Sequence, residues 1–512
     1  MTLLSNAQAR SQRLDALTFN RLHGRLVWGS GLGWAMDAMD VGLISFILVA
    51  LPESWAVSSA DKSWIAAAGF SGMAIGASLG GLIADRLGRR QVFALTLLVY
   101  GLATGASALA WGVGALIALR FVVGLGLGAE LPVASTLVSE FSPPRIRGRV
   151  IVWLEAFWAL GWTAAALIGY YVASPTGVFG AAGWRVALLI GAVPAAYAVF
   201  VRRSLPESVR FLQSKGRFDE AEAAVQAFER ASTLSSRTMP TTQSPTPPAA
   251  RSATSTSRSA TRDLGPTMSA PEATTPASGP PAGRAAQRGA AGPGETDRTA
   301  SADGDTASEF TPVRARVSAL FTGGMAARTR AIWTVWFCVN FAYYGAFTWL
   351  PTLLTADGAS VTKSLGYTLI ITLAQLPGYA CAAWLIELWG RRVTLTVFLA
   401  GAAGAAGLFA LASGPGQIIA AGMALSFFNL GAWGALYAIT PEIYPTTLRG
   451  TGAGWAAGFG RLASIVTALA TMPLHARLGT GPVFAIFGTC FLIAAAAAWA
   501  LPEMRGRQLA EA

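Results

Sequence analysis

The sequence predicts an all-α membrane protein in which twelve transmembrane helices form two pseudo-symmetric six-helix bundles, and three observations carry this prediction. First, 53% of the 512 residues are hydrophobic and only 12% are charged, about half the charged share of an average soluble domain. Second, apolar runs of about 20 residues recur from Leu26 to Leu501, each long enough to cross a hydrocarbon core of about 30 Å. Third, two motifs recur at one fixed spacing.

The apolar runs define the expected spans, with ends placed to within about four residues. The predicted spans are residues 26–51, 64–84, 91–111, 113–140, 150–172, 184–201, 331–354, 364–387, 393–412, 416–440, 451–473 and 482–501. They divide the chain into an N-terminal tail (1–25), an N-terminal six-helix bundle (26–201), a connecting loop (202–330), a C-terminal six-helix bundle (331–501) and a C-terminal tail (502–512).

The placement of the basic residues predicts the orientation of the chain in the membrane. Arginines cluster in the connections after even-numbered spans and in both tails, whereas the connections after odd-numbered spans hold little beyond Lys62, Lys363 and Arg477. By the positive-inside rule, both termini and the 202–330 loop are expected in the cytoplasm. Topology therefore explains the net charge of +12 without a nucleic-acid partner, and the expected partner is the lipid bilayer.

The long connecting loop departs from the membrane pattern. From Ala231 to Glu309 it contains no aromatic residue and is rich in Pro, Ser, Thr, Ala and Gly. Such a composition cannot bury enough apolar surface to fold, so residues 231–310 are expected to be disordered. Before this stretch, Phe218–Arg230 reads as a short amphipathic helix.

The repeated motifs indicate a duplicated six-helix unit. Asp85-Arg86-Leu87-Gly88-Arg89-Arg90 matches Glu387-Leu388-Trp389-Gly390-Arg391-Arg392, 302 residues further on. Glu140, Pro143, Arg147 and Gly148 match Glu442, Pro445, Arg449 and Gly450, again 302 residues apart. Because two separate matches share one offset, duplication explains them better than chance, and such a protein is built to alternate between two states.

These motifs resemble a known family. The two acid-x-x-Gly-Arg-Arg connections, Glu140–Arg149 (EFSPPRIRGR), Pro441–Pro445 (PEIYP) and Leu205–Ser208 (LPES) look like the sugar-porter and metabolite:proton symporter branch of the major facilitator superfamily. Within that branch, Met36–Ile44 (MDAMDVGLI) is most similar to bacterial niacin transporters and to aromatic-acid:proton symporters. The resemblance covers both membrane halves and implies a transporter of the bacterial inner, or cytoplasmic, membrane.

Charged residues of the repeated connections are candidates for the conformational switch, because a carboxylate and a guanidinium at helix ends can pair and hold one state closed. The alternative is that they are only orientation signals and solvated loop charges. The candidate switch residues are Asp85, Arg89, Glu140, Arg147, Glu387, Arg391, Glu442 and Arg449.

Ionisable residues inside the spans are candidates for proton coupling, since each costs about 2.5–3.5 kcal/mol on insertion scales unless it is paired, neutral or wet. Asp37 and Asp40 share one face of span 1, and the resemblance to proton-coupled sugar porters implies that Asp40 pairs with Arg120 of span 4. The alternative for that pair is a permanent structural salt bridge. Glu130 and Glu155 rank second, because they lie nearer the cytoplasmic helix ends and could snorkel.

Substrate-lining candidates come from the resemblance, as polar or aromatic residues on the spans that line a central cavity. They are Trp158, Trp162, Asn340, Tyr343, Tyr344, Gln375, Asn429 and Tyr437. The alternative is that these side chains are ordinary packing or interfacial aromatics. Span 7 reads Asn-Phe-Ala-Tyr-Tyr where sugar porters are rich in Gln and Asn, which weakens the case for a sugar.

Arg461 is the sharpest substrate candidate, because it lies near the middle of span 11 with no acid within one helical turn. A guanidinium offers bidentate hydrogen bonds to a carboxylate, which an uncharged sugar would not use. The alternative is a permanent pair with Glu130, Asp37 or another acid of the opposite half.

The sequence therefore favours a monomeric secondary active transporter that couples protons to import of a small organic anion, niacin or a related aromatic or monocarboxylic acid. A proton-coupled sugar symporter is one alternative, and a non-transporting membrane sensor on the same scaffold is another. An enzyme is disfavoured, because no nucleophile–base constellation is visible. No cofactor is expected, nor any metal, since His23 and His475 lie too far apart to share one.

Overall fold

The computed structural model describes residues 9–10, 12–143, 146–238, 317–445 and 448–503, and within these all regular elements are helical. The predicted disordered stretch falls mostly at 239–316, outside the described residues. In the N-terminal half the long helices are α2 (Arg21–Ala50), α3 (Ser59–Leu87), α4 (Arg89–Ser107), α5 (Val113–Phe141) and α6 (Arg147–Ile168), which continues as a π-helical turn, η2 (Gly169–Ala173). Shorter helices follow: α7 (Gly183–Ile190), α8 (Val193–Ser204), α9 (Val209–Ser214) and α10 (Phe218–Thr238).

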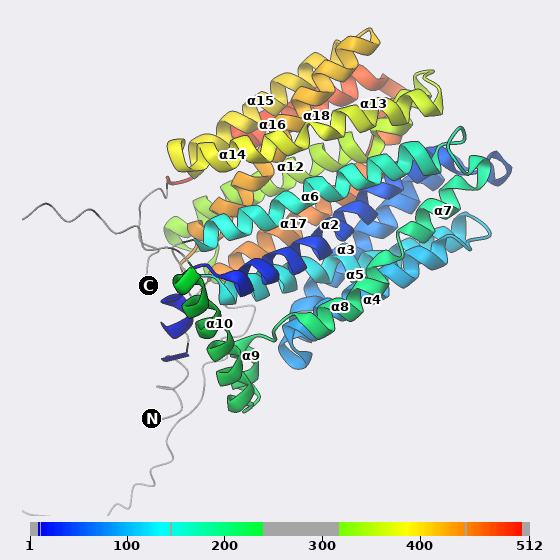
Figure 1. Cartoon of the computed structure of the whole chain (residues 1–512). Coiled ribbons are helices and arrows are strands. Elements are labelled where there is room, and N and C mark those ends of the chain that lie inside the picture. The colour runs from blue at the N-terminus through cyan, green and yellow to red at the C-terminus, as the bar shows by residue number, and fades with distance from the viewer. Residues whose placement is uncertain (1–8, 11, 144–145, 239–316, 446–447, 504–512) are drawn as a thin grey trace, which may run out of the picture. The chain divides into compact units, whose positions relative to one another are not determined.

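The C-terminal half repeats the pattern of long helices (Figure 1). Its helices are α12 (Gly323–Ala356), α13 (Val361–Leu373), α14 (Gln375–Trp389), α15 (Arg391–Ala410), α16 (Pro415–Ile443), α17 (Arg449–Leu478) and α18 (Thr480–Trp499). Within the described residues, ten stretches are long and apolar enough to cross a membrane, and α4 and α12 lie at the third and seventh predicted spans. The helices run past most predicted ends; α12, for example, begins at Gly323 rather than at residue 331.

Two predicted spans are broken helices. Span 6 divides into α7 and α8 after Ile190, and span 8 divides into α13 and α14 after Leu373. Proline has no backbone N–H and so cannot hydrogen-bond to the carbonyl four residues earlier. Pro194 and Pro377 stand four residues after Ile190 and Leu373, so each break falls where that hydrogen bond is missing.

Small residues bring α3 and α5 into direct backbone contact. A Cβ on Gly72 would lie 2.2 Å from the carbonyl oxygen of Phe121, and one on Gly128 would lie 2.0 Å from that of Met73. Glycine is therefore required at these positions, because any side chain would push the helices apart. The small-xxx-small spacing on these two helices thus serves helix packing.

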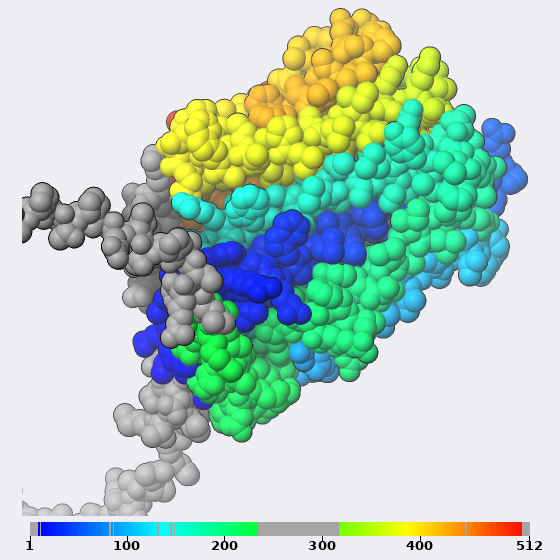
Figure 2. All heavy atoms as spheres, viewed as in Figure 1, coloured from blue at the N-terminus to red at the C-terminus, as the bar shows by residue number. Residues whose placement is uncertain are grey.

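The two halves meet along three sets of helices. α2 packs on α12, α3 packs along α17, and α6 packs on α13, α14 and α16. Figure 1 shows α6, α2 and α17 between the outer helices of the two halves, and Figure 2 shows the surface of α6 lying beside that of α2. The candidate substrate residues all lie on these contact helices.

The helix predicted at Phe218–Arg230 forms as α10 and packs against the residues that precede α2. Arg13 forms ion pairs with Glu222 and Glu229 at 2.7 Å each, and Arg10 lies 2.9 Å from Glu222. On the apolar side, the ring of Phe228 stacks on Phe141 at the end of α5. These contacts hold the beginning of the connecting loop against the N-terminal half. We call this end of the helices, where α2, α4 and α15 begin, the motif end.

Candidate functional site

Asp40 and Arg120 form a buried ion pair inside the N-terminal half. Nη2 of Arg120, on α5, lies 3.3 Å from Oδ1 of Asp40, on α2. The hydroxyl of Thr104, on α4, donates to the same oxygen at 2.5 Å. The side chain of Asp40 is fully buried and that of Arg120 is 4% exposed. Removing one partner of such a pair leaves an uncompensated buried charge, so each group stabilises the other.

Asp37 lies one helical turn from Asp40 and has different neighbours. Its carboxyl group lies next to the carboxyl group of Glu130, on α5, and next to the hydroxyl of Tyr100, on α4. Asp37 and Glu130 are both buried, and neither forms an ion pair with a described basic residue. Glu130 therefore does not snorkel. Two adjacent buried carboxyl groups cannot both be ionised at low cost, so this pair is suited to hold one proton.

The centre of the interface between the halves is aromatic. The indole N–H of Trp158, on α6, donates to the hydroxyl of Tyr343, on α12, at 3.0 Å. Trp162, one turn further along α6, contacts the rings of Tyr343 and Phe347 at 5.9 and 6.4 Å between centroids. We call these four side chains the central aromatic cluster. It joins the halves through ring contacts and one hydrogen bond.

Arg461, on α17, lies beside this cluster. Its Nη1 donates to the hydroxyl of Tyr344 at 2.8 Å, and its guanidinium carbon lies 5.7 Å from the centroid of the same ring. Arg461 is 8% exposed, and no carboxylate of the described residues forms a salt bridge with it. It interacts electrostatically with two acids of the opposite half, Asp37 and Glu155. The permanent ion pair considered as its alternative role is not formed in this state.

The remaining substrate candidates have different surroundings. The hydrogen-bonding groups of Asn340 are satisfied within the protein, because its amide nitrogen donates to the carbonyl of Trp336 at 2.7 Å and its amide oxygen accepts from the hydroxyl of Ser464 at 3.3 Å. Tyr437 stacks on Trp433 at 5.6 Å. Gln375 and Asn429 are fully buried, and the amide nitrogen and oxygen of both have no hydrogen-bond partner. These two unsatisfied amides therefore have hydrogen-bonding capacity for a bound molecule.

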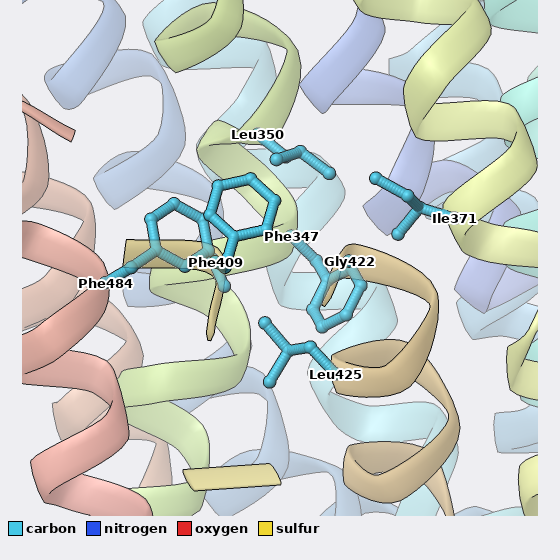
Figure 3. Close-up of a pocket in the computed structure, with 8 residues that line it drawn as sticks. Phe347, Leu350, Ile371, Phe409, Gly422, Leu425 and Phe484 are labelled. Atoms are coloured by element: carbon cyan, nitrogen blue, oxygen red, sulfur yellow. The ribbon is translucent and has the colours of Figure 1, made fainter. Parts of the chain in front are cut away.

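A small pocket lies inside the C-terminal half, between α12, α13, α15, α16 and α18, and Phe347 of the central aromatic cluster forms part of its wall (Figure 3). Its lining is entirely apolar: Ala346, Phe347, Leu350, Ile371, Phe409, Gly422, Leu425 and Phe484. Without a polar group it offers nothing to an organic anion. None of the substrate candidates lines it.

The switch candidates pair mainly within their own halves. Arg89 lies 3.9 Å from Glu140, and the equivalent Arg391 lies 3.3 Å from Glu442. Arg147 donates to the carbonyl of Ser142 and to Asp15, and Arg449 donates to the carbonyl of Pro441. The side chain of Asp85 lies outside the described part of the chain. Glu387 contacts the opposite half, where it lies 3.7 Å from Arg149, which was not among the predicted residues.

Two acidic residues that cap helices at the motif end were also not identified from the sequence. Glu207 accepts from the backbone N–H of Arg90 at 3.1 Å, and Glu503 accepts from those of Arg391 and Arg392, both at 3.2 Å. Each carboxylate caps the first turn of α4 or α15, where the helix leaves its N–H groups unpaired. The signal was present in the sequence, because Leu-Pro-Glu occurs at 205–207 and again at 501–503.

The fold and the motifs can now be compared with known proteins. The family model described as "Major Facilitator Superfamily" matches residues 31–468. The chain belongs to the major facilitator superfamily. It is thus a multi-pass transporter of the cell membrane and not an enzyme, and the predicted fold class is confirmed.

Individual members of the major facilitator superfamily show the same relationship. The chain is 40% identical over 486 residues to the niacin transporter NiaP of Acinetobacter baylyi, covering 95% of this chain and 94% of that protein. It is 39% identical over 473 residues to the putative niacin/nicotinamide transporter NiaP of Bacillus subtilis, covering 92% and 94%. A partially occluded, inward-open structure of the xylose transporter XylE from E. coli has a TM-score of 0.66 at 16% identity, covering 95% of this chain and 99% of that one. The predicted likeness to bacterial niacin transporters is confirmed.

Proposed function

We propose that this protein imports a small aromatic carboxylate of the nicotinate type together with protons. The observation that carries the proposal is Arg461, a buried guanidinium beside the central aromatic cluster with a tyrosine hydroxyl but no carboxylate as its partner. A buried cation that forms no salt bridge with a carboxylate is costly, and an anionic ligand offsets that cost. The neighbouring rings would stack on an aromatic ligand. The 40% identity to a niacin transporter supports the same class of substrate.

Proton coupling is assigned to the buried acids of the N-terminal half. Asp40 can exchange its ion pair with Arg120 for a proton, and the Asp37–Glu130 pair can hold one proton between its carboxyl groups. Protonation removes the charge of a carboxyl group and so lowers the free-energy cost of burying it away from water. The proton would thereby favour one state of the carrier over the other.

Alternating access is assigned to rocking of the two halves about the central aromatic cluster. The ion pairs Arg89–Glu140 and Arg391–Glu442 lie within single halves, so they can survive such a motion. The contacts that must change are those between halves, such as Arg149–Glu387 at the motif end. The switch residues within each half would then keep that half rigid.

Uptake by purified protein in proteoliposomes tests the proposal. An imposed inward pH gradient is expected to drive accumulation of labelled nicotinate. Benzoate should compete, because it keeps the carboxylate and the ring, whereas nicotinamide and xylose should compete weakly, because neither carries the negative charge. Competition by xylose instead of benzoate would favour the sugar-symporter alternative and would contradict this proposal.

Variants of Arg461 test whether this residue binds the substrate carboxylate, a role that we call the anchor. Arg461→Lys keeps the charge but loses the planar fork, and Arg461→Ala loses both, so nicotinate affinity should fall in that order. Loss of a charged hydrogen bond is worth about 1.5–3 kcal/mol, so the alanine variant should bind roughly tenfold to a hundredfold more weakly. Arg477→Ala is the matched control, since Arg477 lies in the last turn of the same helix and is exposed. An unchanged affinity in Arg461→Ala would exclude the anchor.

A further inference from the structure

Glu155 is a buried acid that the proposed proton-coupling residues leave unused. It is 2% exposed and lies on α6, so it does not snorkel as its position near the helix start suggested. Residues 155, 158 and 162 share one face of a helix. Because Trp158 and Trp162 on that face contact α12, Glu155 also faces the C-terminal half.

The groups that face Glu155 come from four helices. From α2 it meets the indole of Trp34, which does not titrate. The titratable or charged groups are Tyr379 on α14, Tyr437 on α16 and Arg461 on α17. Among these only Arg461 carries the opposite charge. The two side chains interact electrostatically but form no salt bridge with each other.

We propose that Glu155 is an internal counter-ion that competes with the substrate carboxylate for Arg461. This inference rests on the proposed function. When Glu155 is ionised, it balances the buried guanidinium in the empty carrier and lowers the affinity of Arg461 for an anion. When Glu155 takes up a proton, its charge is lost and Arg461 is left for the substrate. One proton on Glu155 and one anion at Arg461 keep the net buried charge constant, which links proton uptake to anion binding.

The position of Glu155 along α6 also gives the competition a direction. Glu155 lies one turn closer to the motif end than Trp158, because α6 begins at that end with Arg147. The motif end is the one that the arginine distribution predicts to be cytoplasmic. When Glu155 releases its proton to that side, its negative charge would therefore displace the substrate carboxylate from Arg461. This is the side on which an importer has to release its substrate.

Asp37 is the competing candidate for this role, because it also interacts electrostatically with Arg461. Its carboxyl group, however, lies next to that of Glu130, and the two suit a shared proton. Glu155 has no second acid as a neighbour among the described residues. The geometry therefore favours Glu155 over Asp37 as the group that titrates against Arg461.

Calorimetric binding of nicotinate to the purified full-length protein tests this assignment, with titrations between about pH 5.5 and about pH 8. Wild-type affinity should weaken as the pH rises. Glu155→Gln should bind about tenfold more tightly at the upper end of this range, and its pH dependence should be flatter. The matched control is Glu53→Gln, which removes an exposed acid from the connection after α2 and should behave as wild type. A purely structural role for Glu155 would not increase affinity.

The outcomes separate the two hypotheses. If wild-type protein binds neither nicotinate nor benzoate at any pH, the proposed function fails. If wild type binds but Glu155→Gln, with unchanged thermal stability, binds equally or more weakly, the counter-ion role alone is overturned. A gain in affinity for Asp37→Asn instead of Glu155→Gln would also overturn it. Should Glu155→Gln fold poorly, Glu155→Asp withdraws the carboxylate from Arg461 and should bind nicotinate more tightly than wild type; unchanged affinity would contradict the proposal.

Discussion

Arg149 on α6 and Glu387 on α14 form an ion pair between the two halves, with 3.7 Å between Nε and Oε1. Both side chains are at least half exposed, so the pair is worth about 0–1 kcal/mol. Glu387 belongs to the repeated connection, whereas Arg149 follows the other motif. A residue next to the Glu140–Gly148 motif of the N-terminal half thus contacts the Glu387–Arg392 motif of the C-terminal half at the motif end.

We expect this pair to bias the carrier rather than to bind substrate. Arg149→Gln or Glu387→Gln should open the motif end more often, so label-to-label distances across it should shift in spin-echo experiments, while nicotinate affinity changes less than about threefold. The exchanged pair Arg149→Glu with Glu387→Arg should restore the wild-type distances. If the double exchange behaves as the single variants do, the pair does not govern the equilibrium.

Asp40→Asn should abolish uphill uptake while nicotinate exchange across the membrane persists. The amide keeps a hydrogen bond with Thr104 but cannot carry a proton, and it leaves Arg120 without its counter-charge. The variant should therefore also unfold more readily, since breaking a buried pair costs about 3–5 kcal/mol. Counterflow and pH-driven uptake are measured in the same proteoliposomes. Accumulation by the asparagine variant under a pH gradient would exclude Asp40 as the carrier and point to Asp37.

Gly390→Ala should destabilise the protein and slow uptake. Gly390 has φ of +88°, and a Cβ there would lie 2.8 Å from the carboxylate of Glu503 that caps α15. A positive φ combined with the ψ of 173° at Gly390 is a conformation that essentially only glycine adopts, and it costs a residue with a side chain about 1–3 kcal/mol. Gly404→Ala in the same α15 helix is the matched control, because nothing lies within 4 Å of its Cβ position. Its thermal midpoint should stay equal or rise, and an equal loss in both variants would contradict the capping account.

Acidification should release the segment before α2 from α10. Hydrogen bonds from Arg10 and Arg13 lower the pKa of Glu222 from 4.5 to about 2. A carboxyl group with a lowered pKa stabilises the contact above its unfolded pKa of 4.5 and loses this contribution as the pH falls toward 2. The mobility of a spin label attached at the exposed residue 12 should therefore increase in that window, and Glu222→Gln should increase it at neutral pH. A label as mobile in wild type as in Glu222→Gln at neutral pH would contradict the contact.

Removal of residues 240–305 should leave uptake nearly unchanged. These residues lie outside the described part of the chain, and the expectation comes from their composition, which offers no aromatic side chain for docking. Limited proteolysis of the intact protein should cut there first. Loss of transport at normal membrane levels would instead support a role in recruiting a cytoplasmic partner.

The sequence located the helices and the repeat because hydrophobic runs and a fixed 302-residue offset are one-dimensional signals. It did not locate the breaks in spans 6 and 8. Proline alone does not predict them, since Pro351, Pro441 and Pro473 lie inside unbroken helices. Packing of neighbouring helices decides which prolines end a helix and which are accommodated.

The sequence identified the charged residues of the candidate site but not which of them lie close together. Charge inside an apolar run singled out Asp37, Asp40, Arg120, Glu130, Glu155 and Arg461, all of which are buried. Which acid faces which base depends on helix rotation and tilt, so the proximity of Asp37 to Glu130 and of Glu155 to Arg461 could not be read from spacing. Depth along the helix suggested that Glu155 reaches solvent, whereas α14 and α16 cover it.

The indoles of the interface give the protein an intrinsic optical signal. Trp158 and Trp162 are buried where the halves meet, and Trp34 lies 5.3 Å from Trp158. Other tryptophans, among them Trp111 and Trp153, are exposed and emit from a different environment. An aromatic acid that reaches Arg461 would therefore change the emission of the inner group alone. Fluorescence would then distinguish occupancy of the centre from non-specific partitioning into detergent or lipid, without any attached dye.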